Sequence, residues 1–211
     1  MHKRVLAVVS IFCLGLPLLA SAELHTPLSD NASSHSFDEI DEQTLKAEVS
    51  KQALAFLRTV ESHWGTNQSA LRATLPGQIR DDEHGKLIYL HNLSDHGVLE
   101  GYEFKQESLV RGQYILLQRP LNGLNEFIGY YETLKQVLSD SYGTPRQDRI
   151  TWSNDLYQPL PDYWGVAVMI GHLQYHAEWT TADGTITLDL TGDHHSKLSL
   201  EYGSSRASAQ A

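Results

Sequence analysis

Histidine and carboxylate side chains gather near the C-terminal end of this chain, where they could ligate a metal ion. They are His172, His176, Glu178, Asp189, His194 and His195. At a strand rise of about 3.3 Å per residue, His172 and His176 would lie about 13 Å apart, too far to share one ion. A site would therefore need a neighbouring strand to bring Asp189 or a turn histidine beside His176 and Glu178.

The other interpretation is that these residues are solvated side chains on an open sheet face, with an exposed histidine pair in a turn. We favour it because the sequence shows no recognised spacing of metal ligands. We therefore predict no metal ligand, and we keep His176 and Glu178 as candidate binding residues.

Sequence motifs for other kinds of catalysis are absent. The chain has no Gly-x-Ser-x-Gly pattern, no cysteine after Cys13, and no phosphate loop or dinucleotide fingerprint. Asp81-Asp82-Glu83 offers paired carboxylates, but an acidic run shortly before Gly85 is ordinary turn composition. We predict no catalytic residue and no cofactor.

Aromatic residues suggest a contact surface instead. Tyr157, Tyr163 and Trp164 flank Pro159-Leu160-Pro161 in an expected loop. Tyr and Trp are enriched where proteins bind one another, so residues 155–164 could present an amphipathic binding surface. The alternative is that these rings fold down as a lid over the core.

Two amphipathic helices should position these residues. From about Ser36 to Gly65, apolar residues recur every three or four positions, and the same pattern runs from Asn125 to Tyr142. Gly143 should end the second helix, because glycine adopts the left-handed conformation at little cost and Pro145 prevents continuation.

Strands are predicted after each helix. After the first they cover residues 86–91, 98–105 and 113–118; after the second, residues 148–152, 166–170, 173–180, 185–191 and 197–202. The last three alternate strictly between apolar and polar residues. This pattern is typical of an antiparallel sheet with one buried and one wet face.

We therefore predict an α+β domain over residues 37–202, with two amphipathic helices on one face of an antiparallel sheet. An offset of 78 residues lays the first helix on the second, so residues 37–120 and 121–202 could be duplicated helix-plus-meander halves. The alternative is that two unrelated amphipathic helices align by chance. Residues 23–36 are predicted to be a flexible leader and residues 203–211 a disordered tail.

Residues 1–22 have the composition of a secretory signal peptide. A basic start at His2-Lys3-Arg4 precedes an apolar run over residues 5–19, and Ala20-Ser21-Ala22 supplies small residues for cleavage after Ala22. A membrane anchor is the alternative, but the run is shorter than the roughly 20 apolar residues that a spanning helix needs. The sequence predicts a periplasmic or secreted protein.

The charge of the chain limits its expected partners. Cleavage would remove Lys3 and Arg4 and no acidic residue, leaving 14 basic residues against 26 acidic ones. Nucleic acids and anionic membrane surfaces attract basic proteins, so neither is an expected partner.

No later segment is apolar enough to span a bilayer. The only cysteine lies in the signal peptide, and a secreted chain without disulfides fits a bacterial periplasm or exterior.

The segment 127–202 combines the helix that ends in Tyr142-Gly143-Thr144-Pro145 with Trp152 and a meander through Trp179 to Tyr202. It resembles uncharacterised small secreted or periplasmic bacterial α+β proteins, and it is similar in architecture to periplasmic inhibitor and outer-membrane-assembly modules. The resemblance implies binding rather than catalysis.

We predict a non-enzymatic module that binds another envelope or extracellular protein through the open sheet face or the Tyr157–Trp164 loop. One alternative is a metal-dependent hydrolase on the C-terminal sheet face. The other is a solute-binding accessory protein, which would need a pocket of roughly 300 Å³ or more between helix and sheet.

Overall fold

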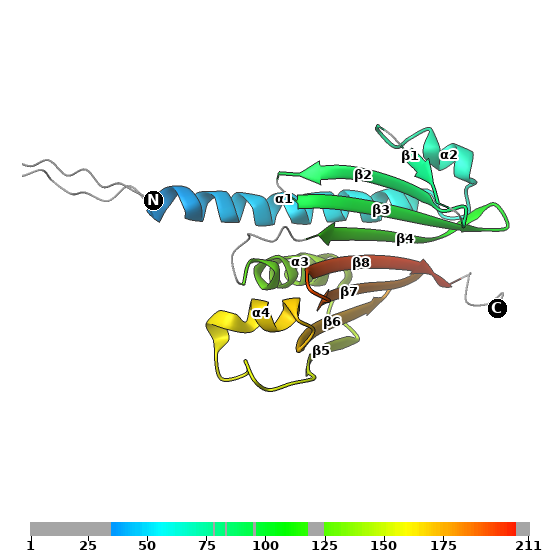
Figure 1. The fold of residues 1–211 in the computed structure, drawn as a ribbon. Helices are drawn as coiled ribbons and strands as arrows, with labels where there is room; N and C mark the ends of the chain where they lie inside the picture. Colours follow the sequence, from blue (N-terminus) through cyan, green and yellow to red (C-terminus); the bar gives the residue numbers. More distant parts are fainter. Residues whose placement is uncertain (1–34, 78, 83, 95, 118–124, 206–211) are drawn as a thin grey trace, which may run out of the picture.

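The computed structural model describes residues 35–205, except residues 78, 83, 95 and 118–124. Within these residues it is an α+β fold with one antiparallel sheet of eight strands, in the order β1-β2-β3-β4-β8-β7-β6-β5 (Figure 1). The helices are α1 (His35–Ser62), α2 (Gln68–Arg72), α3 (Glu126–Tyr142), the short 3₁₀ helix η1 (Pro161–Tyr163) and α4 (Trp164–Met169). The strands are β1 (Ile79–Asp81), β2 (Leu87–Leu93), β3 (His96–Lys105), β4 (Ser108–Leu117), β5 (Gln147–Trp152), β6 (Leu173–Thr180), β7 (Gly184–Gly192) and β8 (Ser196–Ser204). The predicted α+β class and antiparallel sheet are confirmed.

Both long helices bury the apolar stripe that their sequences predict. The buried apolar residues of α1 are Val49, Ala53, Phe56, Leu57 and Val60. Those of α3 are Phe127, Tyr130, Tyr131, Leu134 and Leu138. Because successive members are mostly three or four residues apart, each set lies on one side of its helix.

Gly143 ends α3 at the predicted position, with a positive φ but an extended ψ of −170°. Its φ is 84°, and its N–H donates a hydrogen bond to the carbonyl of Ser139 at 2.9 Å. The indole Nε1 of Trp179 on β6 donates to the Gly143 carbonyl, also at 2.9 Å. The end of α3 is therefore hydrogen-bonded to the sheet.

The alternation predicted for β6, β7 and β8 separates a core face from an open face. Ala177, Leu188 and Leu200 are cross-strand partners on the core face, and all three are fully buried. We call the opposite side the open face; there His176 lies opposite Asp189. The side chains of this pair are 27% and 35% exposed, so the open face is in contact with solvent.

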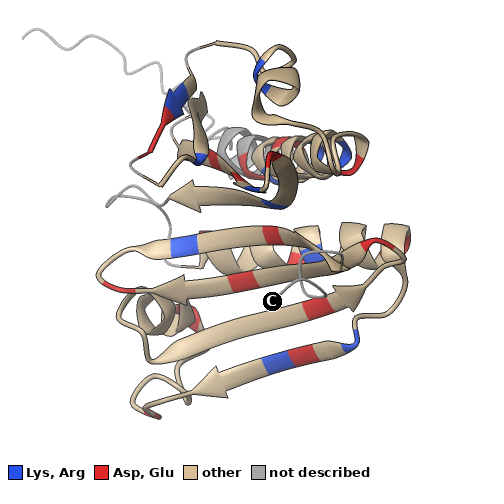
Figure 2. Cartoon of the chain, turned by 90° about the vertical axis from the view of Figure 1, so that its right-hand side faces the viewer, with Lys and Arg blue, Asp and Glu red and all other residues tan. Residues whose placement is uncertain are grey.

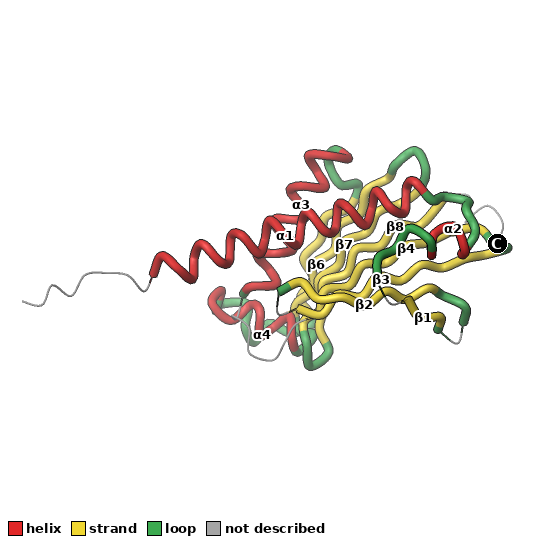
Figure 3. The backbone as a smooth tube through the Cα atoms, turned by 90° about the horizontal axis from the view of Figure 1, so that it is seen from above, coloured by secondary structure: helices red, strands yellow, loops and turns green. Residues whose placement is uncertain are grey.

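The two halves of the chain form a single sheet. β4 is the last strand of the first half and pairs with β8, the last strand of the second half, with Tyr114 opposite Leu200. Helix α1 contacts β4 and β8, whereas α3 contacts β7 and β8 and lies beside α1 (Figure 3). The buried residues of both halves therefore belong to one continuous hydrophobic core in the described part of the chain.

Helix α1 approaches β4 very closely at Gly112. A Cβ atom at this position would lie 2.4 Å from Val60 Cγ2 and 2.9 Å from Phe56 Cζ. Carbon atoms in contact are normally about 3.5–4.0 Å apart, so only glycine lets the helix lie this close to the strand.

One predicted strand is wrong. The strand predicted for residues 166–170 is instead part of α4 and the turn that follows it. Pro161 starts η1, which leads directly into α4, and the helix buries Ala167 and Val168. A short apolar run suits a buried helix as well as a strand, and packing decides between them. The short elements α2 and β1 were not predicted.

The predicted segment boundaries need small corrections. Helix α1 begins at His35, so the leader predicted for residues 23–36 ends within a helix. Strand β8 continues through Ser204, two residues into the tail predicted for residues 203–211. The predicted signal peptide, residues 1–22, lies outside the described residues.

Candidate functional site

The structure pairs the predicted binding residue His176 with an acidic partner on the next strand. His176 Nδ1 lies 2.7 Å from Asp189 Oδ1, and Arg149 on β5 is the other cross-strand neighbour of His176. His176 Nε2 is buried, with no hydrogen-bond partner among the described residues. Because Asp189 orients the ring through Nδ1, a neutral His176 would carry its free lone pair on Nε2.

The second predicted residue of this face, Glu178, does not join the His176–Asp189 pair. It lies opposite Thr187 and Gln147, and its Oε1 is 3.9 Å from Arg146 Nη1. Figure 2 shows acidic positions on each of the strands β5 to β8, with basic positions on β5 and β8. The open face of this half is therefore polar and charged, without a converging set of carboxylates.

The histidines considered as metal ligands are dispersed. The His194 side chain is 88% exposed in the β7–β8 turn, and the His172 ring lies against Tyr157 with centroids 6.3 Å apart. Among the described residues, no three His, Cys, Asp or Glu side chains form a group that could hold a metal ion. The histidine-rich hairpins thus do not assemble a metal centre in this part of the chain.

The predicted aromatic loop is divided between the core and the surface. Trp164 is partly buried, its ring packs edge-on against Trp152 at 5.7 Å, and its Nε1 donates to the Gln158 carbonyl at 3.3 Å. Tyr157 also packs against the core, whereas Tyr163 is 47% exposed. Two of the rings therefore cover the core, and the third is available for contact.

Exposed apolar side chains concentrate around this loop. Seven large hydrophobic residues are exposed in the described part of the chain, and five of them lie between residues 150 and 170. We call these five the β5-edge surface: Ile150, Leu156, Leu160, Tyr163 and Ile170. Ile150 lies on the edge strand β5, and the other four lie in the segment between β5 and β6, whose helix α4 packs against β6, β7 and β8.

Sequence reasoning missed a cavity at the other end of the sheet. It has a volume of about 340 Å³ and lies between α1, residues 74–76 and strands β2 and β3. We call it the N-terminal pocket; its walls include Gln52, Phe56, Thr74, Tyr89, His91 and Glu100. The signal in the sequence was Glu100, a charged residue at a core position of β3 between Val98 and Tyr102.

Hydrogen bonds hold the Glu100 carboxylate in the wall of this pocket. Its Oε1 lies 3.1 Å from His91 Nε2, and its Oε2 accepts a 2.5 Å hydrogen bond from the Tyr102 hydroxyl. Burial raises the pKa of Tyr102 well above its ordinary value, and the neighbouring Glu100 charge adds to the shift. The His91 ring stacks on Tyr89 with centroids 4.8 Å apart.

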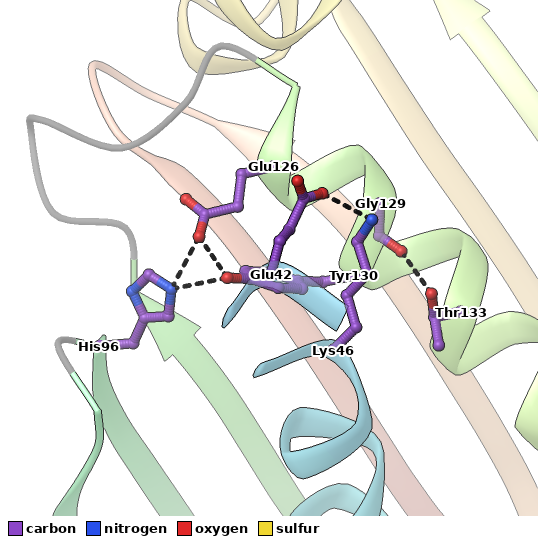
Figure 4. Close-up of polar contacts among 7 residues, drawn as sticks. All are labelled: Glu42, Lys46, His96, Glu126, Gly129, Tyr130 and Thr133. Carbon is purple, nitrogen blue, oxygen red and sulfur yellow. Dashed lines mark hydrogen bonds and ion pairs between the residues drawn. The ribbon is translucent and has the colours of Figure 1, made fainter. Parts of the chain in front are cut away.

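A second buried polar cluster joins β3 to α3 (Figure 4). His96 is 1% exposed; its Nε2 lies 3.1 Å from the Tyr130 hydroxyl and 3.6 Å from Glu126 Oε1. The Tyr130 hydroxyl in turn donates a hydrogen bond to Glu126 Oε1. The His96 ring also packs edge-on against Phe127, so this cluster fixes the first turn of α3 to the sheet.

The same region holds the two long helices together. A Cβ atom at Gly129 would lie 2.7 Å from Lys46 Cε of α1, and Lys46 Nζ is 2.6 Å from Glu42 Oε1 (Figure 4). The aliphatic part of the Lys46 side chain of α1 therefore lies directly against the backbone of Gly129 in α3. The polar groups around His96 and Lys46 hold α3 to the sheet and to α1. The candidate binding sites are the N-terminal pocket and the β5-edge surface.

Comparison of the chain with protein-family models, with curated proteins and with solved structures gives no match. Among the described residues, no helix is both long enough and apolar enough to cross a membrane.

Proposed function

We propose that this chain is an exported, non-enzymatic module that binds another protein of the cell envelope or exterior through the β5-edge surface. The observation that carries the proposal is that five of the seven exposed large hydrophobic residues among those described lie on β5 or in the segment that follows it. Isolated exposed hydrophobic residues are normal on a protein, but a group of them in one region marks an interaction site.

The free edge of the sheet suggests the form of the partner. Among the described residues β5 pairs with β6 alone, so half of its backbone N–H and C=O groups point away from the sheet. The other edge strand, β1, has only three residues, whereas β5 has six. An extended segment of the partner would add a strand to β5 and place apolar side chains against Leu156, Leu160 and Tyr163.

The N-terminal sequence supports the location of the partner. Residues 1–22 have the basic start, apolar run and small-residue cleavage site of a signal peptide. Export, with cleavage after Ala22, would bring the module to envelope or extracellular proteins. N-terminal sequencing of the protein recovered outside the cytosol would test this, because a retained Met1 would contradict cleavage.

Site-specific photo-crosslinking in intact cells tests the binding site. A photoreactive residue at Leu160 should form one discrete adduct, whereas the same residue at Leu90 should form none. Leu90 is the matched control because it is a leucine with similar exposure, 52% against 47%, on strand β2.

A second substitution separates binding from chance contact. L156D should reduce the Leu160 adduct several-fold, because burying a carboxylate against an apolar partner is unfavourable. L90D should leave the adduct unchanged. Equal adducts at Leu90 and Leu160, or no adduct at either position, would contradict the proposal.

We also propose that the two halves arose by duplication, with α1 and α3 as equivalent amphipathic helices on one face of the sheet. The strand order supports this, because each half runs from an outer edge to a central strand, β4 or β8. The test is a wider set of related sequences. Halves that align along their strands as well as their helices would support duplication, and strands without consistent correspondence would contradict it.

A further inference from the structure

The N-terminal pocket has the chemistry of a ligand site that is separate from the β5-edge surface. Its volume of about 340 Å³ lies at the small end of the range for small-molecule sites. The walls come from α1, from residues 74–76 and from the paired strands β2 and β3.

Several polar atoms of this pocket are hydrogen-bond acceptors. Glu100 is only 9% exposed and presents its carboxylate from the sheet. Gln52 Oε1 is buried, with no hydrogen-bond partner in the described part of the chain. The Thr59 hydroxyl donates to the Ala55 carbonyl, which leaves its oxygen lone pairs as acceptors. The Thr74 hydroxyl donates to the Leu71 carbonyl, and its oxygen also lies 3.5 Å from His63 Nε2.

The charged and aromatic groups favour a cation. Among the described residues neither lysine nor arginine lines the pocket, and Glu100 is the carboxyl group in its wall. Phe56 and Tyr89 add aromatic rings, whose faces attract cations and whose surfaces bury apolar carbon. An anion would meet acceptors and a carboxylate, whereas a cation would meet a carboxylate and aromatic rings.

We propose that the N-terminal pocket binds a small organic ammonium compound with an apolar body. The ammonium group donates hydrogen bonds to Glu100 and Gln52 Oε1, and the apolar body packs against Phe56 and Tyr89. The His91 and Tyr102 hydrogen bonds hold the Glu100 carboxylate in position to receive the cation.

Three probes of similar size and different charge test this inference on the whole protein. They are phenethylammonium chloride, 2-phenylethanol and sodium phenylacetate, each titrated while backbone amide resonances are followed by NMR. Phenethylammonium should shift the amides of Gln52, Tyr89 and His91. 2-Phenylethanol should bind at least tenfold more weakly, because a charge-assisted hydrogen bond is worth more than a neutral one, and phenylacetate should not bind.

Two variants assign the binding to the pocket. E100Q should weaken phenethylammonium binding at least tenfold, and Q52L should weaken it several-fold. Gln52 is on the partly exposed side of α1, so Q52L should fold even if E100Q disturbs the buried network. The control Q113L changes a glutamine of β4 that lies outside the N-terminal pocket, and it should bind as the unchanged protein does.

Equal binding of the three probes, shifts confined to residues outside the pocket, or no binding of phenethylammonium at about 10 mM would overturn the inference. These results are independent of the crosslinking at Leu160, because the two sites lie in different halves of the chain.

Discussion

Replacing Gly112 with alanine should measure how tightly α1 is seated on the sheet. The added Cβ would lie 2.4 Å from Val60 Cγ2, more than about 1 Å closer than carbon atoms normally approach. Val60 and Phe56 are 0% and 2% exposed, so neither has free space to move into. Either α1 must shift away from β4 or a core side chain must leave its rotamer.

The magnitude follows from two opposing effects. Overpacking a core typically costs about 1–3 kcal/mol, and a clash this short belongs at the upper end. Alanine recovers up to about 1 kcal/mol because it restricts the unfolded chain more than glycine does. We expect G112A to lower the free energy of unfolding by about 2 kcal/mol, which lowers the Tm by about 4–8 °C for a domain of this size.

Urea unfolding monitored by tryptophan fluorescence, with thermal unfolding by circular dichroism, gives both quantities. The matched control is G97A in β3, where a Cβ atom would have no neighbour within 4 Å, and it should be neutral or slightly stabilising. The double variant V60A/G112A should be more stable than the sum of its single variants predicts, because the smaller residue 60 makes room. An unchanged Tm for G112A, or strict additivity with V60A, would refute the reasoning.

Two further predictions concern the sheet and the buried tyrosines. G184A should destabilise the protein more than G203A in the same urea assay. A Cβ at Gly184 would lie 2.0 Å from the carbonyl oxygen of Gly203, whereas one at Gly203 would meet nothing within 4 Å; equal effects would contradict this. Burial raises the pKa values of Tyr102, Tyr114 and Tyr131 in the folded protein. Above a pH of about 10 the unfolded chain loses phenolic protons that the folded protein keeps, so the free energy of unfolding should fall as pH rises. The expected loss is about 1 kcal/mol per tyrosine between about pH 10 and 11, and a constant urea midpoint over this range would count against it.

The features that the sequence predicted correctly depend on neighbours along the chain. The three- and four-residue spacing from Val49 to Val60 identified the buried side of α1, and Gly143 identified the end of α3. Strict alternation separated Ala177 on the core face from His176 on the open face. Each pattern spans one element, and the geometry of a helix or strand converts it directly into a side that faces the core.

The candidate sites were harder to predict because their residues come from distant positions. The N-terminal pocket is lined by both Gln52 of α1 and Glu100 of β3, and no local pattern in the sequence predicts that these two residues share a pocket. His176 was a candidate from its strand position, but its partner Asp189 depended on the register between β6 and β7. For the aromatic loop, the sequence composition suggested a binding surface. Only the packing of the loop against the core shows that Tyr163 is exposed whereas Trp164 is partly buried.

The sequence by itself determined the α+β class, the two long helices and the two-sided character of the C-terminal strands. Only the tertiary structure decided that β4 pairs with β8 to join both halves in one sheet, and that Ala167 and Val168 are buried in a helix rather than a strand. The periodicity of a sequence shows which side of a helix or strand is apolar. Which apolar sides pack against one another depends on how the side chains of all the elements fill the core together, and that is not encoded in any single segment.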